Sequence, residues 1–82
     1  IKPLVVYPNP ATNILFVESY STAKENIMVS IIDLAGKRIR AEKRIINGHT
    51  AFSIDISALP KGIYTILMKG EMINETKKFI KQ

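Results

Sequence analysis

Cysteine and tryptophan are both absent from this chain, and histidine occurs only once, as His49. A chain without cysteine has no disulfide framework and no thiolate nucleophile. A zinc site needs several ligands in a defined geometry, and His49 has no second histidine or cysteine as a partner. We therefore expect no bound metal, no cofactor and no catalytic residue, and we predict that the chain is not an enzyme.

Long hydrophobic runs and the usual catalytic motifs are also missing. No apolar stretch approaches the roughly 18 residues that a membrane-spanning helix requires, so we expect no transmembrane segment. No glycine-rich phosphate loop is present, and Ser57 lacks the flanking glycines of a nucleophile elbow. Asp33 and Asp55 each begin a turn, where a carboxylate accepts hydrogen bonds from nearby main-chain N–H groups. Their predicted role is therefore structural.

Charge is unbalanced, because twelve Lys and Arg residues stand against seven Asp and Glu, giving +5. This excess favours contact with acidic surfaces, such as nucleic acid, lipopolysaccharide or an acidic protein groove. The densest basic stretch lies between Lys37 and Arg44, and Arg38, Arg40, Glu42 and Arg44 fall on one face of its strand. This pattern favours a solvated sheet face over the alternative, a binding patch. Nucleic acid is not an expected partner, because no helix-turn-helix is present and aromatic residues do not alternate with basic ones.

Short segments of alternating apolar and polar residues are the main secondary-structure signal. They are separated by turn residues at intervals of roughly 8–12 positions, and no helical periodicity extends beyond one turn near Ser57–Leu59. The pattern predicts an all-β fold, an Ig-like antiparallel β-sandwich of about seven strands. The expected strands are Leu4–Tyr7, Asn13–Glu18, Asn26–Asp33, Lys37–Ile45, His49–Ile56, Ile63–Lys69 and Glu75–Lys81.

Two turns carry specific expectations. Asn47-Gly48 between two strands predicts a type I′ hairpin turn. Pro60 and Gly62 form a corner before Tyr64, whose hydroxyl we expect to bond to upstream main chain, as in the tyrosine corner of Ig-like sandwiches. The expected core consists of Leu15, Val17, Val29, Ile31, Ile39, Phe52, Ile54, Tyr64, Ile66 and either Phe79 or Ile80.

Ile14 and Phe16 form a possible contact surface. If Leu15 and Val17 face the core, then Ile14 and Phe16 point to solvent, and an exposed apolar pair can mark an interaction site. Two alternatives remain open on the sequence alone. The strand can be covered on both faces, or the alternation can run the other way.

Four motifs follow one another in a fixed order along the chain. Taken together, they resemble the C-terminal sorting domain of the type IX (Por) secretion system, type A. The resemblance covers residues 6–82, and its motifs are a YPNP opening, a D-L-x-G-[KR] hairpin, a D-[IL]-S-x-L-P-x-G-[IV]-Y corner and a lysine-bearing final strand. They occur here within Val6–Thr12, Ile31–Lys37, Asp55–Met68 and Thr76–Gln82.

The resemblance implies a sorting signal behind an upstream secreted cargo. Its expected partners are the secretion translocon and sortase proteins. The protein is expected to pass through the periplasm to the cell surface or the exterior, and the domain is expected to be removed on anchoring. Residues 1–5 are then a linker from the cargo and residues 6–82 the domain. The implied recognition residues are Lys77, Lys78, Phe79, Ile80, Lys81 and Gln82. The alternative function is an Ig-like accessory or adhesion module of a secreted multidomain protein.

Overall fold

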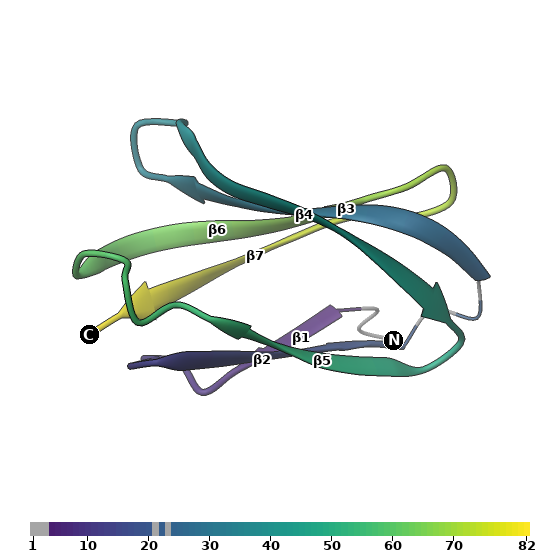
Figure 1. The fold of residues 1–82 in the computed structure, drawn as a ribbon, viewed down its shortest axis with the longest axis horizontal. Helices are drawn as coiled ribbons and strands as arrows, with labels where there is room; N and C mark the ends of the chain where they lie inside the picture. The colour runs from purple at the N-terminus through teal and green to yellow at the C-terminus, as the bar shows by residue number, and fades with distance from the viewer. Residues whose placement is uncertain (1–3, 21, 23) are drawn as a thin grey trace.

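The computed structural model describes residues 4–20, 22 and 24–82, and it shows two layers of strands packed face to face (Figure 1). No strand end differs from its predicted residue by more than two positions. No helix occurs among the described residues. The predicted all-β antiparallel sandwich is therefore confirmed, with strands β1 (Leu4–Tyr7), β2 (Ile14–Ser19), β3 (Lys24–Asp33), β4 (Arg38–Asn47), β5 (Thr50–Asp55), β6 (Gly62–Lys69) and β7 (Asn74–Lys81).

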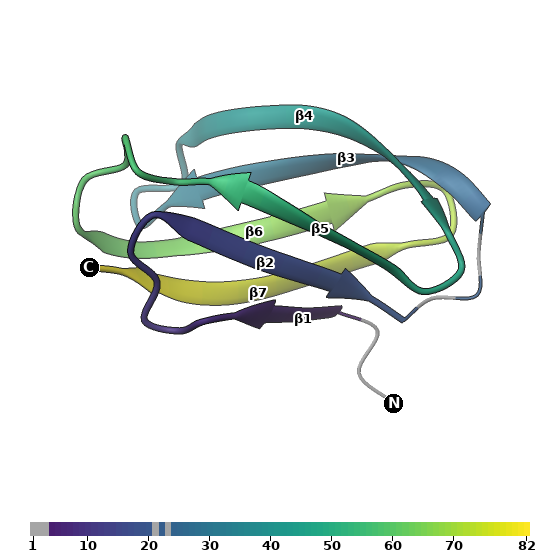
Figure 2. The ribbon, with the colours of Figure 1, turned by 60° about the horizontal axis from the view of Figure 1, so that its bottom comes forward.

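The two sheets have the strand orders β1-β2-β5 and β4-β3-β6-β7, and all their paired strands are antiparallel. The edge strands β1 and β7 lie along the same side of the sandwich (Figure 2). The segment between β1 and β2, which are neighbours in one sheet, reaches the edge of the other sheet, where Ala11 forms a parallel bridge with Lys81 of β7. Two prolines in this segment, Pro8 and Pro10, lie beyond the end of edge strand β1, where no ladder hydrogen bond is lost.

The core is formed by the facing sides of the two sheets. Eight of the predicted core residues are buried, and Phe79 rather than Ile80 is the core residue of the last strand. Ile39 and Phe52 are half-buried and pack against this core. The buried hydrophobic residues are Leu4, Ala11, Leu15, Val17, Ile27, Val29, Ile31, Ile46, Ile54, Ile56, Tyr64, Ile66, Met68, Ile73 and Phe79.

The start of the domain lies earlier than the boundary drawn from the motifs. Leu4 is 1% exposed and, with Val5, belongs to β1, so both residues are part of the sandwich rather than of a linker. β1 pairs with β2 from Leu4 opposite Ser19 to Tyr7 opposite Phe16. Residues 1–3 lie outside the described residues, and the linker there stays a prediction.

The predicted type I′ turn at Asn47-Gly48 is wrong. That turn needs positive φ at both central residues, and no non-glycine residue among those described has positive φ. Gly48, with φ of 68°, is instead the first of two connecting residues between β4 and β5, and His49 is the second. Glycine with positive φ at the first central position is the pattern of a type II′ turn.

A register shift between Ile31 and Ile32 corrects the predicted face of β4. Arg40 pairs with Ile31, but Arg38 pairs with Ile32, so Ile39 is an extra residue on the β4 side. Because directly opposed residues share a face, Arg40 lies on the inner side with Ile31, whereas Arg38 lies on the outer side. The expectation that Arg38, Arg40, Glu42 and Arg44 share one solvated face is therefore wrong.

The inner arginines of β4 reach the neighbouring edge strand of the other sheet. Arg40 donates through Nη1 to the main-chain oxygen of Asp55, and Arg44 donates through Nη2 to that of Ser53 at 3.4 Å. The Arg44 guanidinium also lies 4.7 Å from the centre of the Phe52 ring. These contacts occupy carbonyl groups on the edge of β5 that would otherwise be open to another strand.

Candidate functional site: the tail strand and the aromatic face

The last strand, β7, presents its residues alternately to the core and to solvent. Phe79 is fully buried, and its ring lies 5.6 Å from the ring of Tyr64 on the paired strand β6. Tyr64 donates its hydroxyl hydrogen bond to the main-chain oxygen of Pro60 at 2.5 Å, which confirms the expected tyrosine corner. The corner and the centre of the tail strand are therefore one packed unit.

The end of β7 is held by the segment between β1 and β2. The main-chain N–H of Ala11 donates to the oxygen of Ile80 at 2.7 Å, and the N–H of Gln82 donates to the oxygen of Ala11 at 2.8 Å. The side-chain oxygen of Asn9 accepts from the N–H of Ile80 at 2.9 Å. We call this set of three hydrogen bonds the tail clamp. Asn9 and Ala11 belong to the Tyr-Pro-Asn-Pro-Ala motif, so the first and last motifs of the chain form one structure.

The six residues expected to carry recognition are not equally accessible. Lys77, Lys78, Ile80 and Gln82 are exposed, and Ile80 is 44% exposed. Phe79 and Lys81 are buried, and the Lys81 ammonium donates to the main-chain oxygen of Gln82 at 2.8 Å. A hollow of about 380 Å³ between β1 and β7 is lined by Leu4, Val5, Val6, Asn9, Lys77 and Lys78. The clamp occupies main-chain groups of Ile80 and Gln82, so the groups that remain accessible at this end of the strand are the exposed side chains.

The outer side of the three-stranded sheet carries a second surface, which we call the aromatic face. It consists of Tyr7, Ile14, Phe16, Tyr20 and His49 around Glu18. Ile14 and Phe16 are 45% and 43% exposed while Leu15 and Val17 are buried, so the alternation predicted for this strand is the one observed. The ring of Phe16 is stacked on that of Tyr7 with 5.6 Å between their centres.

Glu18 organises the aromatic face through its carboxylate. The hydroxyl of Tyr7 donates to Oε1 at 2.6 Å, and the hydroxyl of Tyr20 donates to Oε2 at 2.7 Å. His49 Nε2 lies 2.9 Å from Oε2, and the His49 ring stacks on Tyr20. The hydrogen bond from Tyr7, followed by those from Tyr20 and His49, lowers the pKa of Glu18 to about 2. The same bond raises the pKa of the Tyr7 hydroxyl.

Metal-ligating clusters and the turn aspartates are the remaining candidates for a site in the part of the chain that the structure describes. There, no three His, Cys, Asp or Glu side chains gather where they could hold a metal ion. Asp33 and Asp55 occupy turns as expected, with Asp33 Oδ1 accepting from the N–H groups of Ala35 and Lys37 and Asp55 Oδ1 accepting from that of Ser57. Over the same residues, no helix has the length and apolar character to cross a membrane.

Sequence reasoning missed the clamp and most of the aromatic face. The signal for the clamp was Asn9 between two prolines, because an asparagine fixed in an irregular segment commonly bonds to main chain. The aromatic face depends on the pairing of Tyr7 with Phe16, which appears only once the strand register is known. His49, the third hydrogen-bond partner of Glu18, has 57% of its side chain accessible.

Comparison with known proteins agrees with this architecture. A DUF3244 family protein from Bacteroides vulgatus, with an immunoglobulin-like β-sandwich fold, superposes with a TM-score of 0.76 and 20% identity over 98% of this chain and 85% of that chain. Dimeric latent PorU from Porphyromonas gingivalis matches with a TM-score of 0.69 and 14% identity. That match covers 95% of this chain but only 9% of the PorU chain. A search of curated proteins gave no significant match.

The fold is thus Ig-like, as expected from the strand pattern and the tyrosine corner. The family model described as "Secretion system C-terminal sorting domain" matches residues 5–82. The match begins inside β1 and includes the Tyr-Pro-Asn-Pro-Ala segment, the Asp55–Met68 corner and the whole of β7. This chain belongs to the family of type IX secretion system C-terminal sorting domains.

Proposed function

We propose that this domain directs an upstream cargo across the outer membrane through the type IX secretion system, by contacts between its exposed side chains and the translocon. The observation that carries the proposal is the sorting-domain match over residues 5–82. The family implies a secreted or cell-surface protein. Transit through the periplasm and removal of the domain by a sortase on surface anchoring are part of the proposal.

The tail strand is the proposed recognition element. Its main chain is hydrogen-bonded to β6 on one edge and, at Ile80–Gln82, to the clamp on the other. A translocon protein that meets the folded domain there finds side chains rather than free N–H and C=O groups. Lys77, Lys78 and Ile80 are the side chains from which we expect recognition, whereas Phe79 and Lys81 act by holding the strand in place.

The aromatic face is a second proposed protein contact. Interfaces are enriched in tyrosine and phenylalanine, which give large contact areas at low conformational cost. Tyr7, Ile14 and Phe16 are each between 41% and 45% exposed on one sheet face. The same rings also favour the alternative function, an accessory module that binds carbohydrate by stacking, so the experiment must separate the two.

Substitution tests the tail better than deletion does. Removal of Lys81 and Gln82 would break the clamp bond to Ala11 and uncover the core, so that folding and recognition would fail together. The double variant Lys77→Gln/Lys78→Gln changes only exposed side chains and keeps the strand hydrogen bonds. Its matched control is Lys37→Gln/Lys43→Gln, with the same change of charge on or next to β4, at the opposite edge of the same sheet.

The assay is export of a periplasm-directed reporter fused in front of this chain, in a host with a working type IX system. The intact fusion and the control variant are expected at the surface or in the medium. The tail variant is expected to accumulate in the periplasm while remaining folded by protease resistance. Equal export of all three overturns the tail assignment. Periplasmic retention of the intact fusion, in a host that exports its own cargo, rejects the sorting function and leaves the accessory module. That alternative is then supported if the domain binds glycans on an array and the variant Phe16→Ala loses this binding.

A further inference from the structure

The outer faces of the two sheets carry opposite charge. Strand register places five cationic residues on the outer side of the four-stranded sheet, and all five are exposed. None of the described strand positions on that side carries Asp or Glu. The four acidic residues of these strands lie opposite residues whose side chains face the core: Glu25 opposite Ile46, Asp33 opposite Tyr64, Glu42 opposite Val29 and Glu75 opposite Met68. We call this side the basic face, and its cations are Lys24, Arg38, Lys43, Lys69 and Lys78.

The opposite outer side of the sandwich differs in the sign of its charge and in the type of its residues. The described strand residues on the outer side of the β1-β2-β5 sheet include the carboxylates of Glu18 and Asp55 and no lysine or arginine. The domain therefore carries positive charge on one outer face and negative charge on the other. An anionic surface attracts the basic face and repels the aromatic one, so the charges alone fix which side of the domain turns toward it.

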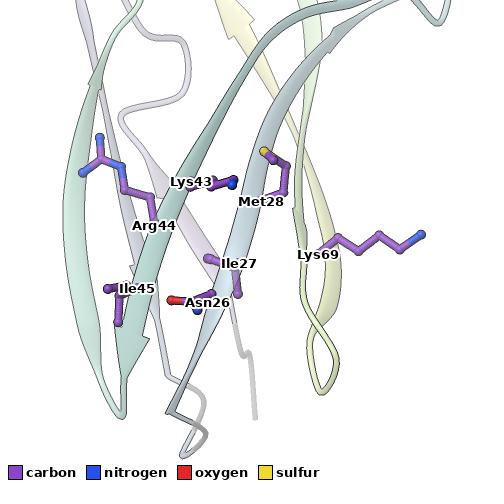
Figure 3. A pocket seen from close by; sticks show the side chains of 7 residues that line it. All are labelled: Asn26, Ile27, Met28, Lys43, Arg44, Ile45 and Lys69. Carbon is purple, nitrogen blue, oxygen red and sulfur yellow. The ribbon is translucent and has the colours of Figure 1, made fainter.

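Apolar side chains lie between the cations of the basic face. Met28 is half-buried between Lys43 of β4 and Lys69 of β6, with which it is paired directly. Figure 3 shows Lys43, Met28 and Lys69 among the residues that line a hollow of about 830 Å³. Arg44 also lines it, although its guanidinium lies over Phe52 of β5. Further along the face, Ile63 and Ile80 are directly opposed and are 41% and 44% exposed. The surface thus offers both cations and apolar contacts.

The kind of cation indicates the kind of partner. Four of the five residues are lysines, which act as mobile point charges on long apolar stems. Specific protein interfaces are depleted of lysine and enriched in arginine and aromatic residues. The described strand positions of the basic face carry one arginine, Arg38, and no aromatic residue. Clusters of lysine beside apolar side chains are instead typical of segments that bind anionic lipid headgroups. From this composition we propose that the basic face docks the domain on a phosphate-bearing, anionic lipid surface, with the aromatic face turned away from it.

Lipid vesicles test the proposal without any secretion machinery, so its failure is distinct from failure of the sorting function. The 82-residue chain is sedimented with vesicles of equal parts phosphatidylcholine and phosphatidylglycerol, and with vesicles of phosphatidylcholine alone. Binding is expected only to the anionic vesicles. It should weaken steeply as salt rises from about 0.1 M, where the screening length is about 10 Å, to about 1 M, where it is about 3 Å.

Two double variants locate the binding side. Lys43→Gln/Lys69→Gln removes the pair that flanks Met28, and neither residue belongs to the tail. The matched control Lys37→Gln/Lys61→Gln removes the same charge from turns at one end of the sandwich. The first should lose about 25-fold in affinity for anionic vesicles, since each lysine near such a surface contributes about fivefold. The control should lose much less, and both should keep the wild-type circular dichroism spectrum.

Several outcomes overturn the proposal. Equal binding to neutral and anionic vesicles shows that binding does not depend on the charge of the lipid. Equal loss of affinity in both double variants shows that binding depends on the net charge of the domain and not on the basic face. Displacement by millimolar inorganic phosphate at constant ionic strength assigns the site to free phosphate. Tighter binding to poly-glutamate than to vesicles, with the same dependence on Lys43 and Lys69, assigns the face to an acidic protein.

Discussion

The side-chain oxygen of Asn9 accepts a hydrogen bond from the main-chain N–H of Ile80 at 2.9 Å, across 71 positions of sequence. Asn9 comes from the segment after β1, and Ile80 lies near the end of β7. With the two main-chain bonds of Ala11, this contact joins the beginning and the end of the domain. The proposed recognition strand therefore depends on the opening motif for its geometry, although the two lie near opposite ends of the domain's sequence.

Replacement of Asn9 tests the tail clamp. Asn9→Ala leaves the Ile80 N–H without its acceptor and should lower the free energy of unfolding by about 1 kcal/mol, the usual net value of one hydrogen bond. Amide exchange at Ile80 should become faster than in the wild type. Asn9→Asp keeps an acceptor oxygen and should retain the protection. Unchanged exchange at Ile80 in the alanine variant would show that the clamp does not restrain the tail.

The tyrosine corner makes a second contribution to the same end of the domain. Tyr64→Phe removes the hydroxyl bond to Pro60 but keeps the ring that stacks on Phe79. We expect a loss of about 1 kcal/mol, which corresponds to a melting temperature lower by roughly 4–8 °C in a domain of this size. Calorimetry at neutral pH measures it. A melting temperature equal to that of the wild type would contradict a stabilising role for the hydroxyl.

Acid should loosen the aromatic face through Glu18. Its pKa is about 2 in the folded domain, below its ordinary value of 4.5, mainly because Tyr7, and then Tyr20 and His49, hydrogen-bond the carboxylate. A depressed pKa stabilises the folded state above the ordinary value, and this stabilisation is lost as pH falls from about 4.5 toward 2. Urea unfolding across this window should show a steeper loss in the wild type than in Glu18→Gln. Parallel pH profiles would refute the assigned pKa.

The alternation in β2 predicts very different effects for neighbouring residues. Leu15 is fully buried, and Leu15→Ala should cost roughly 2–5 kcal/mol, a large share of the stability of a small domain. Ile14 is 45% exposed, and Ile14→Ala should cost much less, near the roughly ±0.5 kcal/mol typical of surface sites. Denaturant unfolding of both variants measures the difference. Similar losses would mean that the outer side of β2 is covered in solution.

The absence of catalytic and metal chemistry is also a prediction. The motivation is the lack of cysteine, the single histidine and the turn-capping use of Asp33 and Asp55. The purified chain should contain no stoichiometric metal by elemental analysis and should not hydrolyse esters, peptides or glycosides. One equivalent of a divalent metal per chain, retained after dialysis, would require a site that these residues do not reveal.

The sequence by itself determined the positions of the strands, the corner before Tyr64 and the core-facing side of β2, β3, β5 and β6. These features are local, because a period of two residues and a turn-forming glycine or proline act over a few positions. The alternation within β2 was therefore enough to place Leu15 and Val17 on the core side, with Ile14 and Phe16 on the outer side. The corner at Tyr64 was equally local, since its hydrogen bond spans only four residues to Pro60.

The tertiary structure decided how distant strands meet. The choice of Phe79 over Ile80 for the core follows from the pairing of Tyr64 with Phe79, which the alternation within β7 leaves open. One extra residue at Ile39 turns Arg38 outward and Arg40 inward, which no periodic pattern predicts. The Asn9–Ile80 bond and the Glu18 cluster likewise join segments far apart in sequence. Register and sheet order are set by the packing of the whole sandwich, so they became visible only in the folded chain.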